Sequence, residues 1–341
     1  MTIKSSGSLN TTEIVAEWGG SQPNSLSEYY AGGSLVYSGA ADGDGNAIPS
    51  SGNPISFSDF FDTTKFVEAD DFTTVSATGT RNGGQDTSTV TVPAAANAIY
   101  VVNTVAGGGG GLRGSDHKGV GEDPGDGGGG AAAISAGYFT VAGGETLTLN
   151  VGRGGNDNVA FWNTAIYSQQ SNSTDRDGGN TSIVGSSSGT LFNLGGGTGA
   201  TATSVGGFTS LRQDSAGSGG AIGSFSGNLS SGTTTGGASV GAVSSTAGSA
   251  GSDGPSVGEN QQGNGGAGGN SGLGSGGGSG GTNNNNGSDG TLGGGGGGGH
   301  SQSTSASPAS NDGDHGSGAG FSTYGGRGGQ GQIQYKFVRV T

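Results

Sequence analysis

The sequence predicts a mainly β protein, in which a small N-terminal module of short helices precedes a β-sandwich-like domain with a large glycine-rich polyglycine-II insertion. Three observations predict this fold class. Glycine occupies 84 of 341 positions, more than three times the usual share of about 7%. Strand-like alternation flanks the Gly-rich stretch on both sides, and helix-start patterns are confined to the first part of the chain. We place the module at residues 1–67, the Gly-rich β domain at 68–341 and the insertion at about 156–330.

Composition excludes several classes of protein. Only 28% of the residues are hydrophobic, too few for one large apolar core. The net charge of −14 and the scattered Lys and Arg disfavour nucleic acid as a partner. There is no cysteine, so the chain has no disulfide framework and no thiolate metal site. We expect no membrane insertion and no signal peptide.

Three short helices are predicted in the first 67 residues. At three places, a residue that can cap a helix is followed three positions later by a carboxylate. The pairs are Asn10 with Glu13, Ser25 with Glu28, and Ser56 with Asp59. Helices should therefore start near Thr11, Leu26 and Phe57. Helices this short are marginal alone, so their apolar faces must be buried against each other or against another protein.

Strands are predicted where β-branched and aromatic residues alternate with polar ones. The stretches are 88–92, 98–105, 138–141, 146–151 and 332–340. Gly143 and Gly144 separate two of them and indicate a hairpin. We expect the final strand to pair with the earlier strands and so close the chain back on itself.

A period of three occurs between Gly263 and Gly299, where every third position is Gly at 11 of 13 places. This is the period of the polyproline-II helix, which makes no internal hydrogen bonds. Collagen shares the period but needs abundant Pro, and this chain has seven. We therefore predict packed Gly-rich helices of the polyglycine-II type, bonded backbone to backbone. The alternative is a flexible Gly/Ser linker or a disordered tail.

In such a bundle one register of the repeat should point outward. It holds Asn264, Ala267, Asn270, Leu273, Ser279 and Thr282. The absence of Cβ atoms in the dense register would let neighbouring backbones approach closely.

Two sets of motifs resemble phage proteins. The first runs from Ser6-Gly7 to Glu13, from Ser25 to Tyr30 with Gly32-Gly33, and from Gly52 to Phe61, and it resembles a module found at the start of many phage virion proteins. The second resembles the glycine-rich domain of phage tail-fibre and adhesin-like proteins; it comprises Val92-Pro93, Gly107–Gly111, Gly127–Gly130, 141–155 and 328–340. The resemblance implies a virion location and an all-β plus polyglycine-II architecture.

From this resemblance we expect a structural protein of the phage tail or tail fibre, acting by binding and not as an enzyme. Its partners would be other virion proteins and a host cell-surface receptor, and the particle would hold several copies or a homo-oligomer. The receptor-binding residues are not identified. The expected virion-docking residues are the apolar ones of the helical region, Ile14, Val15, Trp18, Leu26, Tyr29, Tyr30, Ile55, Phe57, Phe60 and Phe61.

No cofactor, metal or catalytic site is expected. Asp42-Gly43-Asp44-Gly45-Asn46 starts like a calcium loop, but Asn53 stands where the twelfth-position Glu should be, so an Asp/Gly turn is favoured. Asp312, Asp314 and His315 form a second weak cluster, and His117 and His300 lie in Gly-rich loops. The aromatic group of Phe161, Trp162, Ile166 and Tyr167 could be a small satellite core or a ligand-binding patch.

Two other functions stay open. A head decoration or minor capsid protein would use the same docking module on another surface. An ice-binding protein would present a flat face of small Ala and Thr residues, whereas the outward register here mixes Asn, Leu, Ser and Thr.

Overall fold

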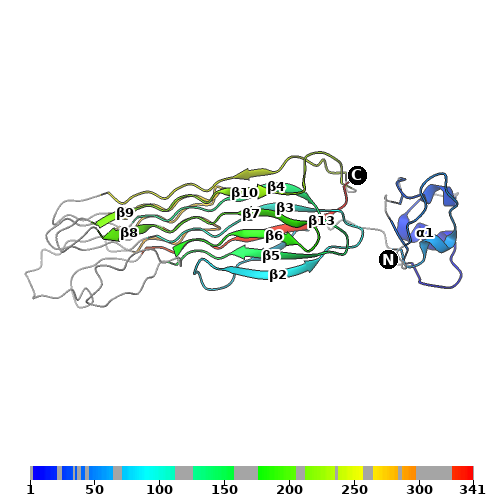
Figure 1. Ribbon diagram of the computed structural model, residues 1–341, viewed down its shortest axis with the longest axis horizontal. Helices are drawn as coiled ribbons and strands as arrows, with labels where there is room; N and C mark the ends of the chain where they lie inside the picture. The colour runs from blue at the N-terminus through cyan, green and yellow to red at the C-terminus, as the bar shows by residue number, and fades with distance from the viewer. Residues whose placement is uncertain are drawn as a thin grey trace, which may run out of the picture.

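The computed structural model describes residues 3–20, 25–33, 35–36, 40–42, 46–63, 71–111, 126–156, 176–204, 212–234, 237–255, 264–282, 286–296 and 325–340. The fold is mainly β. The described helices belong to the N-terminal module, and the antiparallel strands of the second domain lie along one common axis (Figure 1).

The three predicted helices are confirmed, each at its predicted first residue. They are the α-helix α1 (Thr11–Trp18) and two single 3-10 turns, η1 (Leu26–Tyr29) and η2 (Phe57–Phe60). The α-helix ends at Gly19, whose φ of 85° suits glycine. The caps are local interactions, which is why the sequence located these starts so closely.

The module has an apolar core of its own. Its buried side chains come from all three helical elements and from the segments before and between them: Ile3, Ile14, Trp18, Tyr29, Val36, Ala40, Ile48 and Phe60. Polar tips inside this core are satisfied, because Trp18 Nε1 donates to Thr63 Oγ1 at 3.2 Å and Tyr29 OH donates to the Gly19 carbonyl oxygen at 2.8 Å. The short helices are thus buried against each other.

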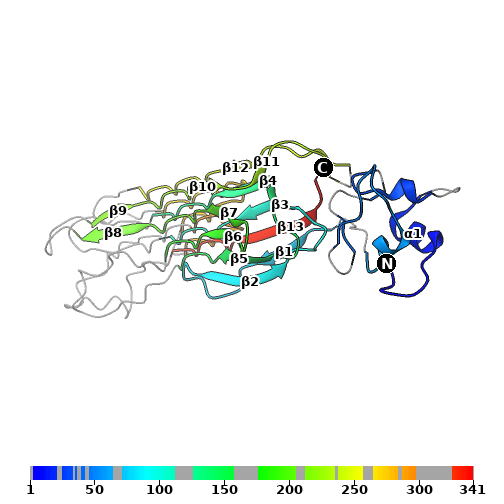
Figure 2. The same cartoon turned by 45° about the vertical axis from the view of Figure 1, so that its right-hand side comes forward.

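The second domain contains two antiparallel sheets. One has the order β1-β13-β3-β4-β11, with β12 also paired to β4, and the other has the order β10-β7-β6-β5-β2 (Figure 2). A separate pair is formed by β8 and β9. The strands are β1 (Thr73–Ser76), β2 (Gln85–Thr91), β3 (Ala98–Val105), β4 (Ala133–Thr140), β5 (Thr146–Gly152), β6 (Thr181–Gly185), β7 (Gly189–Leu194), β8 (Thr201–Ser204), β9 (Arg212–Ser215), β10 (Ile222–Phe225), β11 (Asn228–Leu229), β12 (Ser244–Thr246) and β13 (Gln332–Val338).

The expected return of the final strand is confirmed, because β13 pairs with both β3 and β1. The expected hairpin at Gly143-Gly144 is wrong. The chain does turn there, but β4 pairs with β3 whereas β5 pairs with β2 and β6 in the other sheet. The turn therefore carries the chain from one sheet to the other.

One apolar core includes side chains from both sheets. Val101 and Phe139 come from the first sheet, and Leu149, Ile183 and Phe192 come from the second. The rings of Phe139 and Phe192 lie 5.5 Å apart between their centroids. The apolar residues of the domain are concentrated in the strands, so the Gly-rich segments need another source of stability.

Backbone hydrogen bonds between segments provide it. In the segment 107–111, Gly107 and Gly110 donate to the carbonyl oxygens of Gly179 and Arg176, while Gly108 and Gly111 donate to those of Gly329 and Gly326. Gly109 donates to Gly129. These bonds are 2.7–2.9 Å long, and residues three positions apart donate to the same partner segment.

The same segment accepts from three more neighbours, through the N–H groups of Gly197, Gly155 and Gly296. It is therefore enclosed by six segments of the chain. The segment 126–132 is enclosed in the same way. The neighbours of 126–132 are 195–198, 217–220, 249–252, 269–272, 293–296 and Gly109.

Close backbone approach explains the glycine content of these segments. A Cβ atom on Gly129 would collide with the Ser218 carbonyl oxygen, and one on Gly295 would collide with that of Gly128. Any other residue at such a position would force the two segments apart.

The predicted inward and outward registers are confirmed for the part of 263–299 that the structure describes. In the dense register, Gly266, Gly269, Gly278 and Gly281 are buried, whereas Gly272 and Ser275 are half-buried. In the sparse register, Asn264, Ala267, Asn270, Ser279 and Thr282 are exposed, and Leu273 is half-buried against the apolar core.

The Gly-rich residues do not form one insertion. We expected a single stretch at about 156–330, yet β6 to β12 lie inside this range and pair with each other or with β4 and β5. Gly-rich segments also continue from β3 and lead into β4, before residue 156. Several of these segments are therefore extensions of strands, whereas 264–282 and 286–296 contain no strand and are held by backbone hydrogen bonds to their neighbours.

We call the Gly-rich segments with their backbone hydrogen bonds to one another the backbone lattice. This lattice predicts different outcomes for two Gly→Ala substitutions in the same part of the chain. Gly295→Ala should lower the free energy of unfolding by about 2 kcal/mol or more, because its methyl group meets the buried Gly128 backbone. Gly276→Ala is the matched control: it adds a methyl group to open space and should change stability by less than about 0.5 kcal/mol. Denaturant unfolding measures both, and equal losses would contradict the close-approach explanation.

Candidate functional site

The first candidate site is the N-terminal module, where a six-residue motif occurs twice. Ser25–Tyr30 and Ser56–Phe61 both read Ser, apolar, Ser, acid, aromatic, aromatic. In each copy the acid accepts from the N–H of the first Ser, at 3.1 Å for Glu28 and 2.7 Å for Asp59. The two serine hydroxyl oxygens lie 2.8 Å apart in the first copy and 2.7 Å apart in the second.

The two copies meet in the core of the module. Each directs its first aromatic residue inward, and the rings of Tyr29 and Phe60 contact edge to face with centroids 6.1 Å apart. The second aromatic residue of each copy, Tyr30 or Phe61, has a φ near −60° and a ψ near 138° and is half-buried. The motif therefore assigns one ring to the core and one ring to the surface.

This arrangement corrects part of the docking prediction. Ile14, Trp18, Tyr29 and Phe60 are at most 1% exposed, so they hold the module together and have no surface to offer a partner while it stays folded. Sequence spacing identified them as apolar faces but could not decide what covers them. The other six predicted residues keep some exposure: Val15, Leu26, Tyr30, Ile55 and Phe61 are half-buried, and Phe57 is 37% exposed.

The second candidate site is the distal end of the Gly-rich segments, which we define by Gly111, Asp126, Arg176, Ala200 and Gly254. Hydrogen bonds connect these ends. Gly110 donates to the Arg176 carbonyl oxygen at 2.7 Å, and Ala200 donates to that of Gly110 at 3.0 Å. The pair β8–β9 lies at this end of the domain (Figure 1). The described ends of these segments are therefore bonded to one another.

Aspartates cap the backbone at the distal end, a role that sequence analysis missed. Each accepts a hydrogen bond from the N–H of another segment: Gly254 to Asp126 at 2.7 Å, Gly199 to Asp177 at 2.8 Å and Ala216 to Asp253 at 3.0 Å. The signal was present, since each Asp stands within two residues of a Gly-rich stretch. These carboxylates satisfy donors that have no carbonyl partner in the lattice.

Hydroxyl groups perform a similar role along the outer segments. Ser218 N–H donates to Thr198 Oγ1 at 2.6 Å, and Ala267 and Asn270 donate at 2.7 Å to the hydroxyls of Ser252 and Ser249. Each of these three hydroxyls in turn lies within 3.4 Å of the carbonyl oxygen of the same partner residue. The hydroxyls of Thr198, Ser249 and Ser252 thus complete the backbone bonding of the outer segments.

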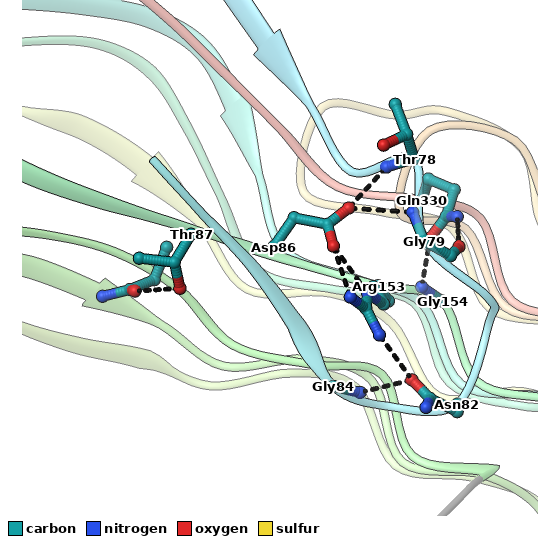
Figure 3. Close-up of polar contacts among 10 residues, drawn as sticks. Thr78, Gly79, Asn82, Gly84, Asp86, Thr87, Arg153, Gly154 and Gln330 are labelled. Atoms are coloured by element: carbon teal, nitrogen blue, oxygen red, sulfur yellow. Dashed lines mark hydrogen bonds and ion pairs between the residues drawn. The ribbon is translucent and has the colours of Figure 1, made fainter. Parts of the chain in front are cut away.

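A cluster of polar contacts surrounds Asp86 on β2 (Figure 3). One carboxylate oxygen accepts from the N–H groups of Thr78 and Gly79 at 2.6 and 2.9 Å, and the other accepts from Nε of Arg153 at 2.8 Å. Gln330 bridges the same region by donating to the Gly79 carbonyl oxygen and accepting from Gly154 N–H. The cluster joins the β1–β2 connection to two Gly-rich segments.

The contacts of Asp86 stabilise its charged form. Its pKa lies below the ordinary value because the Gly79 N–H, the Arg153 guanidinium and the Thr78 N–H stabilise the carboxylate, against an opposing effect of burial. A carboxylate held in this way is a poor proton acceptor. Glu145 is similar: burial, which would raise its pKa, is outweighed by donors from Ala142, Ser187 and Ser188, so its pKa is lowered.

Several expectations fall wholly or partly outside the described residues. They concern the aromatic group at 161–167, the cluster at 312–315 and all three histidines. In the part of the chain that the structure describes, no group of three or more His, Cys, Asp or Glu side chains could hold a metal ion. Asp42 accepts from Asn46 N–H at 2.7 Å, as in a turn. None of the described helices is long and apolar enough to cross a membrane.

Comparison with known proteins adds no relative. No protein-family model matches the chain, and no curated protein matches its sequence. The residues, their contacts and the motif resemblance therefore carry the functional argument.

The Asp86 cluster predicts a pH-dependent contribution to stability. Because the pKa of Asp86 is lower in the folded than in the unfolded state, the contribution is complete above the unfolded pKa of about 3.9 and is lost as the pH falls through the folded pKa. Asp86→Asn should lower the free energy of unfolding at pH 7 by about 2 kcal/mol. The difference in unfolding free energy between Asp86→Asn and the wild type should become smaller as the pH falls below 4. Urea unfolding at several pH values measures this. A loss that is the same at pH 7 and pH 3 would contradict the assignment.

Proposed function

We propose that this protein is a structural component of a phage virion, a tail or tail-fibre protein whose Gly-rich domain projects towards the host surface. The N-terminal module would dock onto other virion proteins, and the distal end would carry the loops that touch the host. The observation that supports this most is the construction of the Gly-rich segments, which bond to each other on all sides and so make a stiff projecting support.

We further propose that the Gly-rich segments form a polyglycine-II bundle, with the two sheets packed as a β-sandwich at its base. A polyproline-II helix has three residues per turn, so its successive N–H groups point in three directions. The donors of 107–111 follow this rule, because residues three apart share a partner segment. The single apolar core that both sheets contribute to supports the sandwich.

Rigidity and variability are divided in a way that suits attachment. Each internal backbone bond contributes on the order of 1 kcal/mol without requiring an apolar side chain. The segments can therefore extend beyond the apolar core and still be ordered. Loops on such a support can change in sequence without loss of the fold, which is the usual arrangement of binding loops on rigid scaffolds.

The N-terminal module supports a separate docking role. It has its own core and its own hydrogen-bonded caps, so it can act as a folded unit. A head decoration or minor capsid protein would use the same module, and the two proposals differ only in where the chain sits on the particle.

Immunogold labelling of phage particles locates the protein. Antibodies against the Gly-rich domain should label the tail or its fibres. Label on the capsid would replace the tail proposal by the head alternative, and particles without label would reject the virion role. A thermal-hysteresis measurement on the purified chain should give no effect, whereas a clear effect would favour ice binding.

The docking role predicts a difference between two aromatic residues of the same turn. Phe57→Ser removes an exposed ring and should reduce incorporation of the chain into particles while the module stays folded. Phe60→Ala removes a buried ring and should destabilise the module by about 3–5 kcal/mol. Quantitative immunoblots of purified particles, with unfolding curves of each variant, measure both. Normal incorporation of Phe57→Ser would exclude this ring from docking.

A further inference from the structure

The strand β2 forms an edge unlike the other edges of the two sheets. The other described edge strands are short or irregular: β1 has four residues, β11 has two, and β10 and β12 have register shifts. By contrast, β2 has seven residues that pair with β5 without a shift. In both ribbon views β2 lies at the border of its sheet (Figures 1 and 2).

The ladder with β5 decides which backbone groups of β2 are left over. Val92 N–H donates to the Glu145 carbonyl oxygen at 2.8 Å. Because hydrogen bonding alternates along an antiparallel strand, the backbone N–H and C=O groups of Val90, Ser88 and Asp86 also face β5. The N–H and C=O groups of Gln85, Thr87, Thr89 and Thr91 therefore point to the open side.

Among the described residues, side chains cap such groups elsewhere but not on the open side of β2. On the outer Gly-rich segments, the hydroxyls of Thr198, Ser249 and Ser252 accept from neighbouring N–H groups. On β2, Thr87 Oγ1 instead donates to Asn150 Oδ1 on β5 at 3.0 Å, away from the open side. The strand also contains neither Lys nor Pro, the residues that commonly block edge pairing.

We propose that the open side of β2 pairs with β2 of a second copy of this chain, antiparallel and with Ser88 of both copies at the two-fold axis. This register brings Gln85 opposite Thr91 and Thr87 opposite Thr89, so all the outward groups are used, in about eight backbone hydrogen bonds. An antiparallel edge is self-complementary, which is what a two-fold interface requires. The two five-stranded sheets become one continuous sheet.

Charge favours a second copy at this place. The chain carries a net charge of −14, so most contacts between copies bring negative surfaces together. On β2 the one charged residue is Asp86, and its carboxylate is paired with Arg153. With Ser88 at the axis, each Asp86 lies opposite Val90 of the other copy, not opposite a second carboxylate.

Cysteine cross-linking tests the register, because the chain has no cysteine of its own. Under mild oxidation the full-length Ser88→Cys chain should form a disulfide-linked dimer, since the two positions face each other in a non-hydrogen-bonded pair. Thr87→Cys and Thr91→Cys are the matched controls on the same strand. They lie off the axis and should cross-link at least tenfold more slowly.

Sedimentation of two further variants tests the edge itself. Thr89→Pro removes an outward N–H without touching the β5 ladder and should convert the dimer into a monomer. Thr89→Val keeps the N–H and should stay dimeric. Urea unfolding identifies any variant that fails to fold, and Thr89→Lys, which blocks the edge by charge, then takes the place of Thr89→Pro.

Each remaining outcome overturns the proposal. A wild-type chain that is monomeric at all concentrations would mean that β2 does not pair with itself. A folded Thr89→Pro or Thr89→Lys chain that stays dimeric would place the interface elsewhere. A trimer, or faster cross-linking at position 87 or 91 than at 88, would exclude the two-fold centred on Ser88.

Discussion

The structure of the second domain depends on direct hydrogen bonds between the backbones of neighbouring glycine segments. Ordinary domains separate their backbones by side chains and are stabilised by burying those side chains. Here the separation is removed, and residues such as Gly109 and Gly129 bond at 2.8 Å across segments far apart in the chain. Stability therefore depends on the number of satisfied backbone groups, and a single methyl group added between two such backbones would clash with one of them. The high glycine content is a geometric requirement of this packing.

A backbone lattice has a boundary at which donors and acceptors lose their partners, and the polar residues of this chain serve that boundary. Aspartates accept from N–H groups at the distal end, serine and threonine hydroxyls accept along the outer segments, and Asp86 with Gln330 joins the lattice to the sheets. The carboxylates of Asp86, Asp126 and Asp177 thus hold backbone N–H groups in place. The strand β2 differs because no side chain in the described part of the chain caps its outward backbone groups.

The two parts of the protein use opposite means of stabilisation, which suits a division of function. The N-terminal module is a small apolar core closed by capped turns, and the half-exposed Tyr30 and Phe61 remain at its surface beside the buried Tyr29 and Phe60. The Gly-rich domain extends well beyond its apolar core because backbone bonds need no apolar residues. In the proposed role, the first part provides a compact attachment unit and the second provides a stiff support for binding loops.

Features that depend on neighbours a few residues away could be predicted from the amino-acid sequence. The capping pairs located all three helix starts, alternation located five of the strands, and the period of three separated the buried register of Gly266 and Gly269 from the exposed register of Asn264 and Asn270. These signals are local, because caps span three residues and a repeat fixes its own facing. The tertiary structure was needed to show which segments are neighbours, because glycines carry no side chain by which one segment could specify another. It also showed that the turn at Gly143 leads into a different sheet, that strands divide the expected insertion, and that Trp18 lies inside the module.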